Sequence, residues 1–193
     1  MEWRSRLGLG TEEWRGHFER QAGLSQHIRR YLFEGFSDGP ILEVGCGTGA
    51  VTGHIAEIAG MNVVALDVDI SFLRHAASAY PMIEPVLGDG LRMPFKDDAF
   101  AAVLCAHYLV WQSDGASAIE EMVRVLRPRG MLAVIAEPDH TARIDYPEEF
   151  SYGPREAEAL RKLGADPEAG RKLKAWMVGA GLERIEVGTG FGH

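Results

Sequence analysis

Cysteine is scarce in this chain, and that scarcity excludes several classes of protein. Only two cysteines, Cys46 and Cys105, occur among 193 residues, without a CxxC pair or a histidine cluster. The sequence therefore offers neither a disulfide framework nor a zinc site, and we expect no bound metal. A reducing, cytoplasmic location suits this cysteine usage.

Long hydrophobic runs are missing as well. The N-terminal segment lacks the apolar core of a signal peptide. No run reaches the roughly 18 apolar residues that a membrane-spanning helix needs. We therefore expect a soluble protein without a membrane span.

Basic residues are outnumbered. Lysine and arginine total 20 against 28 aspartates and glutamates, so the formal net charge is -8 at pH 7. Non-specific binding to nucleic acid depends on lysine and arginine side chains that neutralise phosphates. The balance argues against a nucleic-acid partner, and it leaves the oligomeric state open.

The residues that are present suit one α/β domain, since the chain is 46% hydrophobic and long enough to bury a core. Apolar runs alternate with amphipathic ones, the pattern of βα units that build a doubly wound, Rossmann-like, mostly parallel sheet flanked by helices. We predict strands at 41–44, 61–66, 85–87, 101–105, 131–136 and 182–187. We predict helices at 51–59, 71–80, 115–126 and 167–179.

Two segments stand outside this alternation. Residues 1–38 have partly helical spacing and are expected to lie over the mouth of the site, ahead of the main domain at 39–193. The insert at 138–164 is less regular, aromatic and acidic, and a long connection after a strand often carries function. We expect its aromatic residues to form a lid on the substrate side: Tyr146, Phe150 and Tyr152.

The stretch "ILEVGCGTGA" at 41–50 brings three glycines between a predicted strand and a predicted helix. Bare backbone beside a helix N-terminus lets a ligand approach closely. The stretch also satisfies G-x-G-x-x-G/A, the fingerprint of dinucleotide-binding proteins. Glu43 favours a different ligand, because a carboxylate repels a pyrophosphate and attracts an ammonium or sulfonium group.

With Glu43 ahead of its glycines, "LEVGCGTG" resembles the E-x-G-x-G-x-G motif of class I S-adenosylmethionine-dependent methyltransferases. Three later segments are similar to that family in the same order: "VVALDVDISFLRHA", "LGDGLRMPFKDDAF" and "EEMVRVLRPRGMLAV". The likeness covers residues 40–136 and 166–187 and is greatest to the small-molecule branch that includes quinone-biosynthesis methyltransferases. Ala101 and Arg129 depart from the family, which commonly has Asp and Gly there.

The resemblance implies S-adenosyl-L-methionine as the cofactor and assigns residues to it. Asp67 would hold the ribose hydroxyls, Asp89 would accept from the adenine amino group, and Val68 and Leu91 would enclose the ring. A carboxylate at the end of a strand can indeed accept two O–H hydrogen bonds. The other residues implied to bind the cofactor are Glu43, Gly45, Cys46, Gly47, Thr48, Gly49, Gly90, Cys105 and Ala106.

The implied reaction is methyl transfer to a small-molecule acceptor by in-line displacement. Alignment and desolvation supply most of the acceleration, so a base is needed only where the acceptor must lose a proton. In "CAHYLVWQ", His107 is the candidate base, with Tyr108 and Trp111 as pocket walls, although a purely structural histidine is equally compatible. In "AEPDH", Asp139 and His140 lie at the same rim.

Two alternatives remain open at this stage: a nicotinamide-dinucleotide oxidoreductase and a non-catalytic cofactor-binding module. The chain's end raises a further question, because the family's sheet has strand order 3-2-1-4-5-7-6. "LERIEV" is the predicted sixth strand, and only "GTGFGH" follows, too short for a seventh strand of about five to six residues. Three explanations are a fragment of a longer chain, a strand donated by a partner, and direct pairing of the sixth strand with the fifth.

Overall fold

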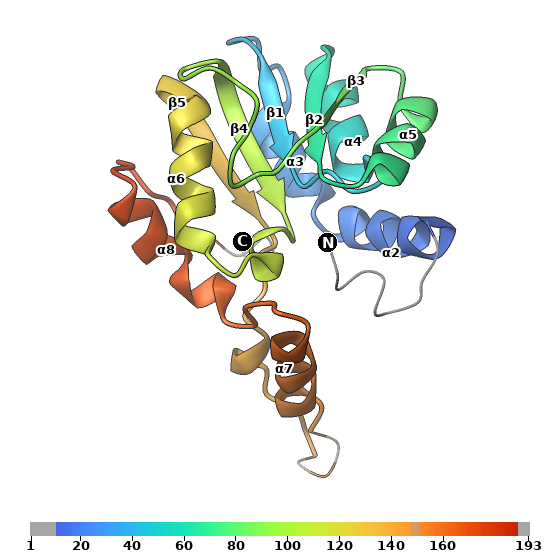
Figure 1. Cartoon of the computed structure of the whole chain (residues 1–193), viewed down its shortest axis with the longest axis vertical. Helices are drawn as coiled ribbons and strands as arrows, with labels where there is room; N and C mark the ends of the chain where they lie inside the picture. The colour runs from blue at the N-terminus through green and yellow to red at the C-terminus, as the bar shows by residue number, and fades with distance from the viewer. Residues whose placement is uncertain (1–10, 148, 150, 189–193) are drawn as a thin grey trace.

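A computed structural model describes residues 11–147, 149 and 151–188 of the chain. Its described residues contain a five-stranded sheet in the order β3-β2-β1-β4-β5, with every neighbouring pair parallel (Figure 1). The strands are β1 (Ile41–Val44), β2 (Val63–Asp67), β3 (Ile83–Leu87), β4 (Phe100–Ala106) and β5 (Leu126–Ile135). The predicted α/β fold with a doubly wound parallel sheet is therefore confirmed.

Helices cover both faces of this sheet. They are α2 (Thr11–Leu24), α3 (Gln26–Phe33), α4 (Ala50–Ala59), α5 (Ile70–Ala79), α6 (Gly115–Val125), α7 (Gly153–Lys162) and α8 (Ala169–Gly179), with short 3₁₀ turns η1 (Leu109–Trp111) and η2 (His140–Ala142). Helices α3 and α4 pack on one face together with α5, and α6 and α8 pack on the other. Strands covered on both sides read as continuous apolar runs, which explains why β1 and β4 are conspicuous in the sequence.

Single glycine and aspartate residues mark where three of the helices end or begin. Gly60 ends α4 in the left-handed conformation at φ 65°, which a residue without Cβ adopts at low cost. Asp69 begins α5 by accepting the Ser71 N–H at 2.8 Å, and Asp114 begins α6 by accepting the Ser117 N–H at 3.0 Å. Asp69 and Asp114 are therefore the N-cap residues of α5 and α6.

The predicted sixth strand is wrong, because residues 182–187 form no strand and pair with no part of the sheet. Gly181 at φ 80° and Arg184 at φ 55° interrupt the extended backbone that a strand needs. Val187 is 79% exposed, so this segment also lacks the burial that would favour pairing. Direct pairing of this segment with β5 is therefore ruled out, and the described residues contain no seventh strand.

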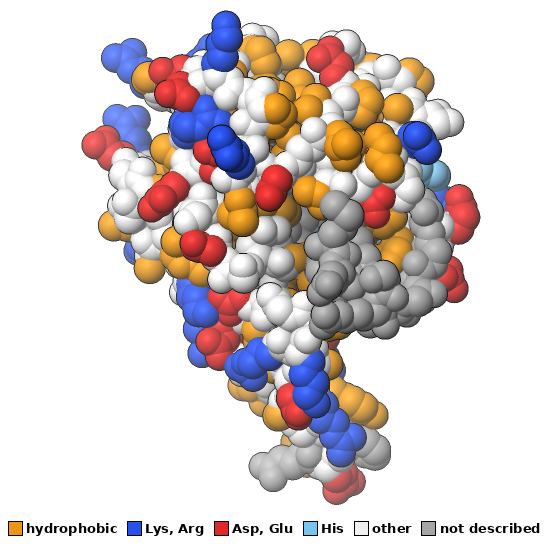
Figure 2. Space-filling model, in the orientation of Figure 1, with side chains coloured by type: hydrophobic (Ala, Val, Ile, Leu, Met, Phe, Trp, Pro, Cys, Tyr) orange, Lys and Arg blue, Asp and Glu red, His pale blue; other side chains and the backbone are white. Residues whose placement is uncertain are grey.

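The insert at 138–164 is more regular than predicted, since it contains α7 and η2, which contact each other. These elements project from the sheet domain as an arm, and charged side chains of both signs lie over the arm's surface (Figures 1 and 2). Tyr146 is 93% exposed and Tyr152 56% exposed, while Phe150 lies outside the described residues. None of the helices described here has the length and apolarity required to span a membrane.

Candidate active site

A cavity of about 890 Å³ opens at the carboxyl ends of the five strands. Its walls come from α2, from the turns that follow β1 to β4, and from the arm that carries η2 and α7. Ligands of doubly wound sheets bind at this edge, and the volume is within the usual range for a small-molecule site. Helix α2 supplies Trp14, His17 and Phe18 to the wall.

The glycine turn after β1 owes its shape to backbone conformations that glycine favours. Gly45, Gly47 and Gly49 have φ angles of 74°, 53° and 84°, all in the left-handed region. The N–H groups of Gly45 and Cys46 donate to the Leu66 carbonyl, at 2.8 and 3.0 Å. Gly47 N donates to Asp67 Oδ2 at 2.8 Å, and Gly49 N donates to the Cys46 carbonyl at 3.0 Å. These four N–H groups already have protein acceptors, which disfavours a pyrophosphate ligand that would need them.

Three residues expected to bind the cofactor lie apart from the cavity wall. A Cβ on Gly49 would be 2.7 Å from Ala76 Cβ, so this glycine permits α5 to pack closely. Thr48 is 1% exposed and does not line the cavity. Cys105 is fully buried in the core beside α6. Thr48, Gly49 and Cys105 pack inward, away from the cavity, and are therefore not part of the proposed site. The motif alone does not reveal this packing.

Glu43 is an acidic group buried at the floor of the cavity, with 1% exposure. It accepts a short hydrogen bond from the Thr52 hydroxyl. Burial raises the pKa of Glu43 to about 8, although the Thr52 hydroxyl and the Arg29 charge act in the opposite direction. The carboxyl is thus largely neutral at pH 7 in the free protein, and a bound cation would favour its ionised form.

Arg29 of α3 is a buried cation that sequence reasoning missed. It is 1% exposed and donates to Ser25 Oγ at 2.8 Å, to the Ala22 carbonyl at 2.7 Å and to His54 Nδ1 at 3.0 Å. Burial lowers its pKa, while Glu43 raises it. Nothing in the local pattern "IRRYLF" distinguishes Arg29 from its exposed neighbour Arg30 except the helical spacing of the apolar residues.

The two strand-end aspartates both line the cavity but differ in environment. Asp67 is 2% exposed, and its two oxygens accept from Gly47 N and Asp69 N, so it also holds the glycine turn together. Asp89 is exposed and accepts from Leu91 N at 2.9 Å. Each carboxylate oxygen has a second lone pair with which it could accept from a ligand.

Aromatic rings face two of the glycines. A Cβ on Gly45 would be 2.4 Å from Tyr108 Cδ2, and a Cβ on Gly47 would be 3.0 Å from Phe18 Cε2. The Tyr108 hydroxyl lies beside Gly90, is buried and has no hydrogen-bond partner among the described residues. A ligand that contacts Gly45 directly must therefore displace the Tyr108 ring by side-chain rotation.

His107 lines the cavity directly after β4, at a positive φ of 50° that is uncommon outside glycine. Burial, followed by the nearby His17 and His140, lowers the pKa of His107 to about 4. Its imidazole is therefore neutral at pH 7, and its low basicity makes it a weak proton acceptor.

Glu137 organises the turn that carries His107 and Tyr108, a role that the sequence did not reveal. Its Oε2 accepts from Tyr108 N at 3.1 Å and Leu109 N at 3.0 Å, and its Oε1 accepts from Val110 N at 2.5 Å. Burial raises the pKa of Glu137 to about 7 against the effect of these three donors. The contact joins the end of β5 to η1 across a long sequence separation, and no local pattern encodes it.

His140 and Glu156 form the polar end of the cavity on the arm. His140 Nδ1 lies 3.4 Å from Glu156 Oε1. Asp139, in contrast, does not line the cavity; it begins η2 and pairs with Arg171 of α8.

The exposed Tyr146 and Tyr152 do not line the cavity, so the expectation of an aromatic lid finds no support in their positions. The described residues hold no group of three or more histidine, cysteine or acidic side chains suited to a metal ion.

Comparisons with known proteins agree with this geometry. Residues 42–134 match the family described as methyltransferase domain. A demethylmenaquinone methyltransferase of Renibacterium salmoninarum is 34% identical over 121 residues, which cover 61% of this chain and 50% of that protein. Ajmaline N-methyltransferase of Rauvolfia serpentina is 32% identical over 149 residues, which cover 71% of this chain and 50% of that protein. The chain thus spans about half the length of these curated relatives.

Among solved structures, a S-adenosylmethionine-dependent methyltransferase of Thermotoga maritima, described as a possible histamine N-methyltransferase, is similar with a TM-score of 0.68. The two chains are 20% identical, and the match covers 90% of this chain and 78% of the other. This similarity concerns the fold. Residues 42–134 therefore belong to the methyltransferase domain family. The resemblance inferred from the motifs is confirmed.

Proposed function

We propose that this protein is an enzyme that transfers the methyl group of S-adenosyl-L-methionine to a small-molecule acceptor. The single observation that carries the proposal is the cavity at the carboxyl ends of the strands, whose wall includes Glu43, Asp67 and Asp89. Three carboxylic groups favour a ligand that carries positive charge, as S-adenosylmethionine does on its ammonium and sulfonium groups. The N–H groups of Gly45, Cys46, Gly47 and Gly49 already donate to protein acceptors, which argues against a dinucleotide whose pyrophosphate would need them.

The residues of the cavity fit this cofactor. Glu43 is buried, and a bound ammonium group would favour its ionised form. Asp67 and Asp89 would accept from the ribose and the adenine, and Val68, Gly90 and Leu91 would help to hold the adenine ring. Gly45, Cys46, Gly47 and Ala106 complete the proposed cofactor side. When bound, the cofactor supplies an activated methyl group, and the protein contributes orientation and exclusion of water.

The acceptor is proposed to enter between α2 and the arm that carries η2 and α7. Apolar side chains on this side include Trp14, Trp111 and Leu160, which suits a partly apolar molecule. The two curated relatives are named for action on a menaquinone precursor and on an alkaloid, both small molecules. We also infer a cytoplasmic location and no nucleic-acid partner, supported by two buried cysteines that form no disulfide and by the net charge of -8.

Calorimetric titration with S-adenosylmethionine, its demethylated product and NAD tests the cofactor assignment. We expect binding of the first two and none of NAD. Asp89→Ala should weaken S-adenosylmethionine binding by about 1 to 2 kcal/mol, roughly 5- to 30-fold, because a hydrogen bond to a charged acceptor is lost. Asp38→Ala removes an exposed carboxylate outside the cavity and should leave the affinity unchanged. Binding of NAD and not of S-adenosylmethionine would support the oxidoreductase alternative.

Turnover separates an enzyme from a non-catalytic cofactor-binding module. Incubation with methyl-labelled cofactor and cell extract should label the small-molecule fraction. Label confined to protein or RNA would contradict the acceptor class, and cofactor binding without any labelled product would favour the non-catalytic module.

A further inference from the structure

His140 and Glu156 come from different elements but meet at one wall of the cavity. His140 belongs to η2, directly after β5, and Glu156 belongs to the first turn of α7. His140 Nδ1 and Glu156 Oε1 are 3.4 Å apart, and both residues line the cavity. The imidazole side chain keeps 24% exposure and lines the cavity, and its Nδ1 lies within ion-pair distance of the Glu156 carboxylate.

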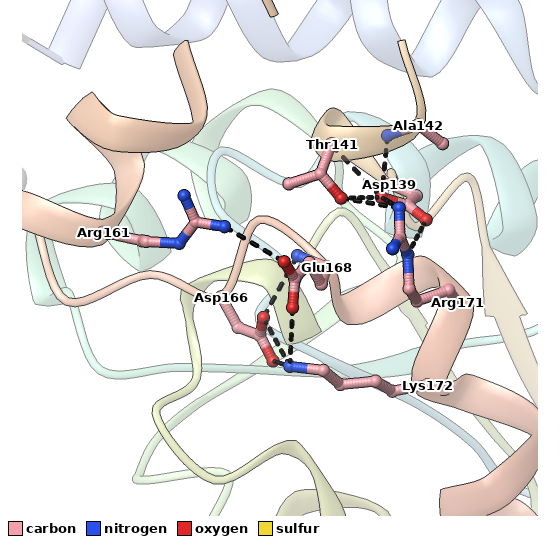
Figure 3. Close-up of polar contacts among 8 residues, drawn as sticks. All are labelled: Asp139, Thr141, Ala142, Arg161, Asp166, Glu168, Arg171 and Lys172. Carbon is pink, nitrogen blue, oxygen red and sulfur yellow. Dashed lines mark hydrogen bonds and ion pairs between the residues drawn. The ribbon is translucent and has the colours of Figure 1, made fainter. Parts of the chain in front are cut away.

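The turn that carries His140 is held by contacts on several sides. Asp139 accepts from Thr141 N at 3.2 Å and Ala142 N at 3.1 Å, and Arg171 of α8 binds Asp139 with two nitrogens (Figure 3). Arg171 also donates to Thr141 Oγ1 at 2.6 Å, and His140 N donates to the Pro167 carbonyl at 2.8 Å. These contacts hold η2 against the start of α8.

The helix that carries Glu156 is tied to the same region. Arg161 near the end of α7 pairs with Glu168 at 3.0 Å, and Lys172 of α8 pairs with Asp166 at 2.7 Å (Figure 3). Both elements of the pair are therefore attached to the beginning of α8. These contacts position the backbone segments from which the His140 and Glu156 side chains extend, and positioned segments favour a pair of side chains that act together.

We propose that His140 is the proton acceptor of this site, that Glu156 is its positioning residue, and that the acceptor substrate carries its nucleophilic oxygen or nitrogen with a dissociable proton. The inference rests on the proposed methyltransferase function. A carboxylate at Nδ1 selects the tautomer that leaves the Nε2 lone pair for the substrate, and it stabilises the imidazolium that forms. Among the described residues His107 has no carboxylate partner of this kind, and its weak basicity suits it to a wall position.

The acceptor heteroatom forms a bond to the methyl carbon while the bond from that carbon to sulfur breaks, and the bonding electron pair stays on sulfur. The proton of the heteroatom passes to Nε2 of His140, and the Nδ1–H stays beside the Glu156 carboxyl group. Other charged or titratable groups near the pair are Arg143, whose Nη1 lies 3.5 Å from Glu156 Oε2, and His107, whose pKa His140 helps to lower.

Nitrogen-15 NMR of the histidine rings tests the pairing without any turnover. In the complex with S-adenosylhomocysteine, we expect neutral His140 to carry its proton on Nδ1, with the signal assigned from its loss in His140→Asn. Glu156→Ala should shift His140 toward the other tautomer. Glu158→Ala, on the same helix and paired with Lys162, is the matched control and should change nothing. An unchanged His140 tautomer in Glu156→Ala would overturn the positioning role.

Methyl transfer to named probes tests the catalytic role: hydroquinone for a phenol, tryptamine for an amine and dimethyl sulfide for an acceptor without a dissociable proton. We expect transfer to hydroquinone or tryptamine only. His140→Asn should lower kcat by about 10²-fold or more and abolish the rise of kcat with pH, whereas His107→Asn should keep that rise. Transfer to dimethyl sulfide alone, or loss of the pH dependence in His107→Asn only, would overturn the proposal.

Cofactor titration distinguishes a failure of this inference from a failure of the proposed function. His140→Asn should bind S-adenosylmethionine as the wild type does, because His140 lies outside the proposed cofactor contacts. If the wild type binds the cofactor and transfers its methyl group while His140→Asn is equally active, only the proton-acceptor assignment fails. If the wild type does not bind the cofactor, the proposed function itself fails.

Discussion

Buried polar atoms determine how single residues around the cavity respond to change. The Tyr108 hydroxyl lies beside Gly90 without a partner among the described residues. Glu137, by contrast, accepts three backbone N–H groups, and Asp67 joins the glycine turn to β2. A buried group without a partner costs desolvation free energy, whereas a fully bonded group stabilises its surroundings. The Tyr108 hydroxyl therefore destabilises the turn after β4, whereas Glu137 stabilises it from the end of β5.

Tyr108→Phe is expected to raise the free energy of unfolding by up to about 1 kcal/mol, because it removes an unpaired buried hydroxyl and keeps the ring. Urea denaturation of the cofactor-free protein measures this change. Tyr31→Phe alters a tyrosine that is 85% exposed and should have no effect. A loss of about 1 kcal/mol in Tyr108→Phe would show that the hydroxyl has a hydrogen-bond partner in solution.

Among the elements, β5 departs furthest from regular geometry. Its pairing with β4 shifts between Leu126, opposite Phe100, and Met131, opposite Ala102, so the residues between them bulge from the ladder. Arg129 lies in this bulge at φ 66°, where the family commonly has glycine. A side chain with Cβ is strained in that conformation.

Arg129→Gly is therefore expected to stabilise the protein by about 1 kcal/mol, since relief of the left-handed strain exceeds the extra chain entropy of glycine. Thermal or urea unfolding gives the value. Arg127→Gly is the matched control in the same strand, without a positive φ, and should destabilise by about 0.5 to 1 kcal/mol. Equal destabilisation by both variants would contradict the proposed strain.

At the scale of the whole molecule, the charge balance of the buried groups sets the response to pH. Burial raises the pKa of Glu43 to about 8 and that of Glu137 to about 7, against an ordinary value of 4.5. The folded state therefore binds more protons than the unfolded state between about pH 4.5 and 8, and these groups make stability fall as pH rises through that window. His107, with its lowered pKa, acts oppositely, but only below its ordinary value of 6.5.

Between pH 6.5 and 8 we expect the free energy of unfolding to fall by about 2 kcal/mol, chiefly through ionisation of Glu43. Denaturation curves across that range measure the slope. Glu43→Gln keeps an acceptor for the Thr52 hydroxyl but cannot ionise. It should remove most of the pH dependence of the free energy of unfolding. Glu57→Gln, at an exposed position of α4, should retain the wild-type slope. A wild-type slope in Glu43→Gln would mean that Glu43 is ionised in the free protein throughout.

Local patterns were sufficient to predict β1, the glycine turn, α4 and β4, and to expect Asp67 and Asp89 at one edge of the sheet. Apolar runs, glycines and caps act within a few residues, and parallel strands bring their carboxyl ends together whatever the details of packing. Contacts between side chains of distant elements could not be predicted from these local patterns. The tertiary structure turned Gly49 toward α5, directed Glu137 to η1, left 182–187 outside the sheet and brought His140 to Glu156. Each of these outcomes depends on which surfaces meet in three dimensions, and a contact between distant elements leaves no periodic trace along the chain.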